Sequence, residues 1–200
     1  GFVKAGSAGA LRKRFEKGGD QASGVIAIAW GASDVAAIFE RREAAAPARI
    51  IASGNTGTLR EEIQAAGKQG LCFVDSAGVK EAFYALAQCA DGAPVEYDVI
   101  ATTKTETFEK ELNALAAKGM RLIPAGLVGI EKRVLMTSAY NYETVAVVGK
   151  VTETTPLAYR VIGTVRLSTF EHELQAVSAE GFRLVAFTIG PKEQVAVLAK

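Results

Sequence analysis

The chain has few of the residues on which catalytic and metal sites depend. Among 200 residues there is a single histidine, His172, and it lies between Glu171 and Glu173. A zinc site or a hydrolytic triad normally needs histidine together with partners that converge from other elements. The zincin motif also needs a second histidine one helical turn further on, and none is present. These shortages argue against zinc chemistry and against a triad, and we interpret His172 as a solvated helix residue.

An excess of one charge and long apolar runs are also lacking. The chain carries 23 Lys and Arg against 22 Asp and Glu, which gives a formal net charge of +1. Because nucleic-acid binding depends on basic surface, we expect no nucleic-acid partner. No apolar run reaches the roughly 18 residues that span a bilayer, so we expect no transmembrane segment. The 49% hydrophobic content is enough for a packed core.

The sequence also lacks the motifs of phosphate-binding loops. Glycine clusters at Gly6–Gly9 and Ser53–Gly57 lie between a predicted strand and a predicted helix. Neither ends in the Lys-Ser or Lys-Thr pair of a P-loop, and neither has the spacing of a dinucleotide fingerprint. Turns explain both clusters better, and we expect no cofactor.

Two cysteines, Cys72 and Cys89, leave the redox state open. Cys72 lies in the apolar run LCFV, where cysteine often acts as a small buried hydrophobe. A hairpin folded about Asp75–Gly78 would place Cys72 nearer Phe83 than Cys89. Since a disulfide needs Cα atoms within about 7 Å, the pattern favours two free thiols over a bridge.

An internal repeat is the strongest feature that the sequence does contain. Residues 97–139 share their spacing with residues 159–200, and the matched positions are Phe108/Phe170, Leu112/Leu174, Leu115/Val177 and Gly119/Gly181. The same spacing recurs at 48–88 and, more weakly, at 1–42, where the matching glycine arrives late, at Gly24. A repeat of this length is one supersecondary unit. The sequence therefore predicts four copies.

Each copy has the pattern strand, helix, strand, strand. In the third copy Phe108, Leu112 and Leu115 recur at helical spacing, and Glu109 and Asn113 fall on a face that we expect to be solvated. A glycine such as Gly119 is placed to end the helix in a left-handed conformation. We expect an α+β fold of four βαββ repeats that pair into antiparallel or mixed sheets with helices on one face. The predicted pairs are 1–92 and 93–200, with 140–158 as an inserted, strand-like connection after the strand KRVLMTSA.

One stretch resembles a known family. The run LNALAAKGMRLIPAG, with its Leu112-Asn113 pair, Gly119 and following apolar strand, is similar to the small bacterial domain of unknown function DUF4177. The fourth copy shows the resemblance more weakly, and both copies lack the family's tryptophan, which Met120 and Phe182 replace. The resemblance covers about the second half of the chain. It implies a βαββ unit and supplies no activity.

Strand alternation and exposed aromatic residues give the candidate binding residues. Alternation predicts that four arginines point to the sheet face opposite the helices. Such a face can be plain solvent surface, a salt-bridged contact between the two pairs, or a platform for a ligand with carboxylate or phosphate groups. Trp30 at a predicted hairpin turn, and Tyr140 and Tyr142 at the start of the long connection, are candidate partner anchors. The full set is Arg49, Arg121, Arg160, Arg183, Trp30, Tyr140 and Tyr142.

These observations favour a non-enzymatic interaction module that binds a partner protein, a peptide or a glycan. The alternative is a small-molecule protein or an enzyme with a site for an anionic ligand between the two repeat pairs. Gly1 stands where the other copies have the second residue of a strand. We therefore expect that an upstream segment, such as a signal peptide, has been removed, and that the protein is periplasmic or secreted. A homodimer is compatible with this interpretation.

Overall fold

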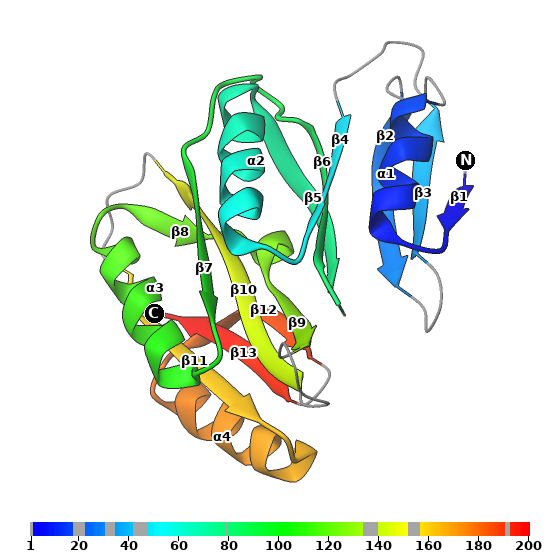
Figure 1. Cartoon of the computed structure of the whole chain (residues 1–200). Coiled ribbons are helices and arrows are strands. Elements are labelled where there is room, and N and C mark those ends of the chain that lie inside the picture. Colours follow the sequence, from blue (N-terminus) through cyan, green and yellow to red (C-terminus); the bar gives the residue numbers. More distant parts are fainter. Residues whose placement is uncertain are drawn as a thin grey trace. The chain divides into compact units, whose positions relative to one another are not determined.

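The chain folds as an α+β protein, as the sequence predicts (Figure 1). The computed structural model describes residues 2–17, 23–30, 35–41, 48–78, 80–133, 140–151, 157–190 and 193–200. Two compact units are present, Gly1–Asp98 and Val99–Lys200, and the boundary between them falls within one strand.

The first unit contains two copies of the βαββ pattern. Its elements are β1 (Phe2–Ala5), α1 (Ala8–Lys17), β2 (Ser23–Trp30), β3 (Val35–Arg41), β4 (Ala48–Ser53), α2 (Thr56–Lys68), β5 (Leu71–Gly78) and β6 (Ala82–Gln88). They form two sheets, of strand order β1-β3-β2 and β4-β6-β5, with antiparallel neighbours. In both sheets the last strand of the copy therefore takes the central place.

The second unit repeats the arrangement with one change. Its elements are β7 (Tyr97–Thr102), α3 (Thr105–Ala116), β8 (Met120–Leu122), the 3-10 helix η2 (Pro124–Gly126), β9 (Val128–Arg133), β10 (Tyr140–Lys150), β11 (Tyr159–Thr164), α4 (Leu167–Ala179), β12 (Arg183–Ile189) and β13 (Gln194–Ala199). The strand orders are β7-β10-β8, with β9 also on β10, and β11-β13-β12.

The third copy extends further than the sequence predicts. Its central strand is β10, which pairs with β8 and β9, so residues 140–150 complete this copy and are not an insertion. The predicted last strand KRVLMTSA contributes Lys132 and Arg133 to β9, and the rest of it lies outside the described residues. The spacing was misleading because the third copy contains one more strand than the others.

A β-bulge marks the same place in the other three copies. The register shifts between Val25 and Ala27 in β2, between Phe73 and Asp75 in β5, and between Leu184 and Ala186 in β12. Counted from the helix-ending glycines, the bulged residues Val74 and Val185 match Ile123, where β8 has ended and η2 is about to begin. The third copy therefore interrupts its strand where the others carry one extra residue.

Glycines end three of the helices in the left-handed conformation that the sequence predicts. Gly70, Gly119 and Gly181 have φ of 71°, 79° and 91°. A side chain at such a φ is strained, which explains why glycine stands there. The prediction for the first copy is wrong, because Gly24 lies inside β2 opposite Glu40.

Within each compact unit, the second sheet is covered on both faces. In the second unit one core contains Phe108 and Leu112 of α3 together with Val195 and Val197 of β13. Residues on the other face of the same sheet, Ile162, Ala196 and Leu198, form a separate core with Phe170 of α4. The first unit behaves alike, since Leu11 of α1 shares a core with Ile50, Phe83 and Ala85. The second copy of each unit thus covers the helix side of the copy before it.

Candidate functional site

Helix α3 covers the free edge of strand β11. The Asn113 side chain accepts a hydrogen bond from the Tyr159 N–H at 2.8 Å and donates one to the Tyr159 carbonyl at 3.0 Å. One turn earlier, Glu109 accepts from the Val161 N–H at 2.8 Å. A further turn back, the Thr105 side chain lies against Gly163, where an added Cβ would be 3.3 Å from its methyl group. One helix stripe therefore takes the place of a neighbouring strand, which satisfies an otherwise open edge.

The Tyr159 side chain lies in the core that α3 shares with the fourth copy. Its hydroxyl accepts a hydrogen bond from the Leu122 N–H at 3.0 Å. Burial raises the pKa of the Tyr159 phenol above its usual value, although the hydrogen bond from Leu122 and the charge of Arg121 act in the opposite direction. The phenol therefore stays neutral at physiological pH and serves packing.

The first unit uses a different side-chain chemistry at the corresponding contact. Helix α1 also lies against β4, and Arg12 binds both carboxylate oxygens of Glu62 at 3.0 Å. Glu62 lies in turn 3.9 Å from the Arg49 guanidinium. Both hydrogen bonds come from Nη1 of Arg12, and this partly buried, charge-assisted pair neutralises the charge of both side chains. The contact between successive copies is thus retained while its residues change.

Two of the four predicted arginines lie on the opposite face from the one expected. Arg49 approaches Glu62 of its own helix α2. Arg160 alternates with Tyr159 and Val161, which pack toward the third copy, so Arg160 starts on the α4 side. The expectation failed because both faces of these strands are buried, as Ile50 and Ile51 at 2% and 0% exposure show. Consecutive residues on opposite faces of the strand are then both apolar, so the sequence does not show which face is exposed to solvent.

The arginines bind separate local partners. Arg160 is 3.2 Å from Glu109. Arg121 donates to the carbonyl oxygen of Ala116, the last residue of α3, at 3.1 Å and to that of Met120 in β8 at 3.2 Å. Arg183 is exposed at the start of β12. These contacts assign Arg49, Arg121 and Arg160 to the scaffold.

The three aromatic candidates lie in strands. Trp30 ends β2 opposite Val35, and Tyr140 begins β10 opposite Arg133; neither side chain is among the described ones. Tyr142 lines a small cavity in the second unit with Glu143, Thr144 and Glu193, and with Gly129, Ile130, Gly190 and Val195. Glu143 in this lining forms an ion pair with Lys132.

A disulfide joins Cys72 and Cys89, contrary to the preference for free thiols. Their Cα atoms are 5.0 Å apart. The predicted hairpin was placed too early, because β5 continues to Gly78 and the register sets Cys72 opposite Ala87. Cys89 follows β6 directly, and its N–H donates to the Gly70 carbonyl. The two cysteines therefore meet at the end of the hairpin ladder.

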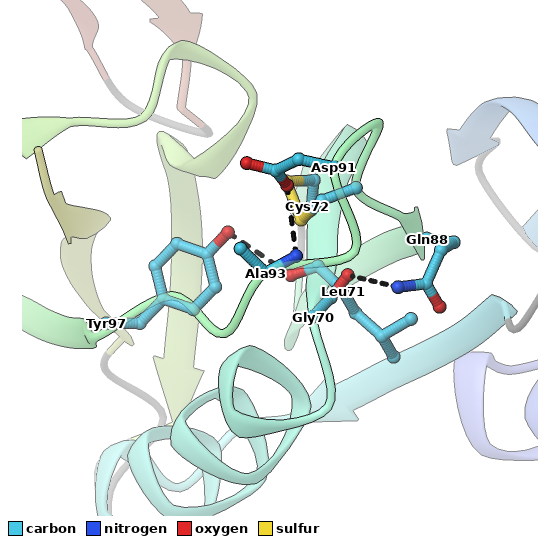
Figure 2. Close-up of a disulfide and its surroundings, with 8 residues drawn as sticks. Gly70, Leu71, Cys72, Gln88, Asp91, Ala93 and Tyr97 are labelled. Carbon is cyan, nitrogen blue, oxygen red and sulfur yellow. Dashed lines mark hydrogen bonds between the residues drawn. A yellow bond between two sulfur atoms is a disulfide. The ribbon is translucent and has the colours of Figure 1, made fainter.

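Several hydrogen bonds surround the disulfide (Figure 2). Gln88 donates to the Gly70 carbonyl at 3.1 Å, and the Tyr97 hydroxyl donates to the Leu71 carbonyl at 3.2 Å. In the loop that follows, Asp91 accepts from the Ala93 N–H at 3.0 Å. The surroundings of the disulfide thus belong to the scaffold of the first unit.

The fourth copy exposes an apolar surface on its helix side. It consists of Leu167 at the start of α4 and of Leu184 and Phe187 on β12, which are 70%, 54% and 46% exposed; Val165 and Ile189 at its margins are 61% and 68% exposed. We call these five residues the α4–β12 surface. Leu184 and Phe187 pair with Leu198 and Ala196, whose side chains lie in the α4 core, so all three strands present this side to α4.

Helix α4 covers its sheet only partly. Phe170 is its one buried residue, and the Phe170 and Phe187 rings lie 5.5 Å apart. Helix α3 buries Phe108, Leu112 and Ala116, because the fourth copy completes the core around them. The side of the third copy that corresponds to the α4–β12 surface is therefore buried, whereas the α4–β12 surface of the fourth copy is exposed. The sequence predicts that Leu184 faces the helix, and nothing in it indicated that the helix leaves this residue exposed.

Other classes of site receive no support from the described part of the chain. No group of three or more histidine, cysteine, aspartate or glutamate side chains there is placed to hold a metal ion. His172 is exposed on α4. No helix among the described residues has the length and apolar character needed to cross a membrane.

Comparison with known proteins gives no relative for this chain. No protein-family model, no curated protein and no solved structure matches it.

Proposed function

We propose that the chain is a protein-interaction module that binds its partner through the α4–β12 surface. Leu184 and Phe187 are exposed on the α4 side of the fourth sheet, and Leu167 is exposed at the start of α4. Large exposed apolar patches on a protein surface often mark interaction sites. The Phe187 ring packs against the ring of Phe170. Large aromatic side chains held by such packing often contribute much of the binding energy of an interface.

The internal architecture indicates the chemistry of the partner. The same side of the third copy is covered by an apolar sheet face and by the edge of β11, which α3 binds through Glu109 and Asn113. Glu171 and Gln175 occupy the matching positions of α4, and both are exposed. The partner of the α4–β12 surface therefore presents an apolar sheet face with a free strand edge.

A photo-reactive amino acid at position 187 tests this function. In an extract of the organism that makes the chain, we expect irradiation to give a discrete cross-linked species. The matched control carries the same amino acid at Val74, an exposed apolar residue of β5. If position 187 cross-links no more than position 74, the proposed function is wrong.

We further propose that the protein works outside the cytoplasm. Support comes from the Cys72–Cys89 disulfide, because such bonds persist mainly in oxidising compartments. Cell fractionation with alkylation of free thiols tests this proposal. The expected result is an alkylation-resistant chain in the extracytoplasmic fraction, and a reduced, fully alkylated chain in the cytoplasmic fraction would contradict it.

A further inference from the structure

The first copy exposes an apolar residue, Ile38, on the sheet face that corresponds to a buried face in the second and fourth copies. Ile38 pairs with Phe2 in the first sheet, as Ala85 pairs with Ile50 in the second and Val197 with Val161 in the fourth. These central-strand residues are equivalent, because each partner lies three residues before the end of its strand. Ala85 and Val197 are fully buried, whereas Ile38 is 48% exposed.

The difference follows from what packs on each residue in the described structure. Ala85 packs with Leu11 of the preceding copy, and Val197 packs with Phe108 of the preceding copy. Ile38 belongs to the first copy, and its neighbour Ala37 faces the core around Leu11. By alternation Ile38 therefore lies on the sheet face away from α1. This is the face that the second and fourth copies bury.

The chain thus presents both halves of a contact that it makes internally. Among the described residues, no sheet face buries the α4–β12 surface, and no helix side buries Ile38 on its sheet face. The contacts between α1 and the second sheet, and between α3 and the fourth, show how such surfaces fit together. Glu171 and Gln175 supply on α4 the exposed polar groups with which Glu109 and Asn113 bind a strand edge.

We propose that the occupant of the α4–β12 surface is a second copy of this chain, docked head to tail through the outer face of its β1-β3-β2 sheet. This inference rests on the proposed function and names its partner. The two surfaces differ, so each added chain leaves one surface of each kind free. Such a contact is heterologous and produces a ring if it closes or an open chain if it does not.

Sedimentation velocity of the purified chain over a range of concentrations tests the proposal. We expect concentration-dependent association of the wild type. Phe187→Asp and Ile38→Asp should each weaken it about tenfold or more, because each places a carboxylate in an apolar contact. Val74→Asp is the matched control and should associate like the wild type. Because these side chains are exposed, the variants should keep the wild-type circular dichroism spectrum.

Mixing the two defective variants makes the test specific. Phe187→Asp retains its sheet face and Ile38→Asp retains its α4–β12 surface, so together they should form a dimer that stops at one junction. A symmetric contact between two α4–β12 surfaces predicts instead that Ile38→Asp self-associates like the wild type and that it forms no heterodimer with Phe187→Asp, and either result would overturn the proposal. A wild type that stays monomeric would also overturn it. If position 187 still cross-links to a protein in the extract, the proposed function survives and only the identity of the partner is wrong.

Discussion

Replacing Cys72 and Cys89 together by serine is expected to lower the free energy of unfolding of the first compact unit by about 2 to 4 kcal/mol. The disulfide spans a sequence separation of 17 residues, and reduction frees this segment in the unfolded chain. The segment includes the β5–β6 hairpin, whose strands form most of the second sheet. The loss should therefore affect the whole unit.

Trp30 is the natural probe for this experiment. It is the single tryptophan of the chain and lies in the first unit, so its fluorescence during urea denaturation reports that unit. A reductant should shift the wild type to the stability of the double variant and leave the double variant unchanged. A wild-type midpoint that does not respond to reductant would show that the disulfide does not stabilise the unit.

Asn113→Ala is expected to destabilise the second unit by about 2 to 3 kcal/mol. The Asn113 amide satisfies both the N–H and the carbonyl of Tyr159, a residue that is 3% exposed. Removing the amide leaves a donor and an acceptor unpaired at the edge of β11. Unfolding of the second unit can be followed by hydrogen exchange of its amides, because Trp30 does not report on it.

Two further variants define the cause of that loss. Glu111→Ala alters an exposed position of the same helix and should change stability by no more than about 0.5 kcal/mol. Asn113→Asp keeps the acceptor for the Tyr159 N–H and loses the donor to its carbonyl, so its effect should be intermediate. Equal stability of Asn113→Ala and Glu111→Ala would show that the edge bonds contribute nothing.

The scaffold was predictable where local chemistry determines it. Gly70, Gly119 and Gly181 end helices because a left-handed residue is required there, and the apolar spacing of Phe108 and Leu112 predicted α3. These features depend on residues close in sequence. They therefore repeat visibly from copy to copy.

Features that depend on contacts between copies were not predictable in the same way. Glu109 and Asn113 were expected on a solvated face, because spacing alone does not show that a strand edge from the next copy lies against them. Thr105, Glu109 and Asn113 are spaced four residues apart, and this stripe of polar residues along one side of the helix was the available signal for the contact. Arg160 was assigned to the wrong face for a related reason, since both faces of β11 are covered.

The disulfide and the long third copy were missed because the pairing register is not local. The bulge at Val74 and the continuation of β5 to Gly78 determine where the hairpin turns, and Cys89 lies beyond its last strand. Strand β10 was recognised as a strand, but nothing in its composition indicated that it would take the central place between β7 and β8.

In each compact unit, a helix of one copy covers the sheet of the next copy and holds the two copies together. Amide hydrogen exchange of the full chain tests this arrangement most directly at Tyr159 and Val161, whose N–H groups point away from β13 and bond to Asn113 and Glu109. We expect these amides to be as strongly protected as that of Ile162, which points toward β13 by alternation. Exchange of Tyr159 and Val161 at the rate of an unstructured peptide would contradict it.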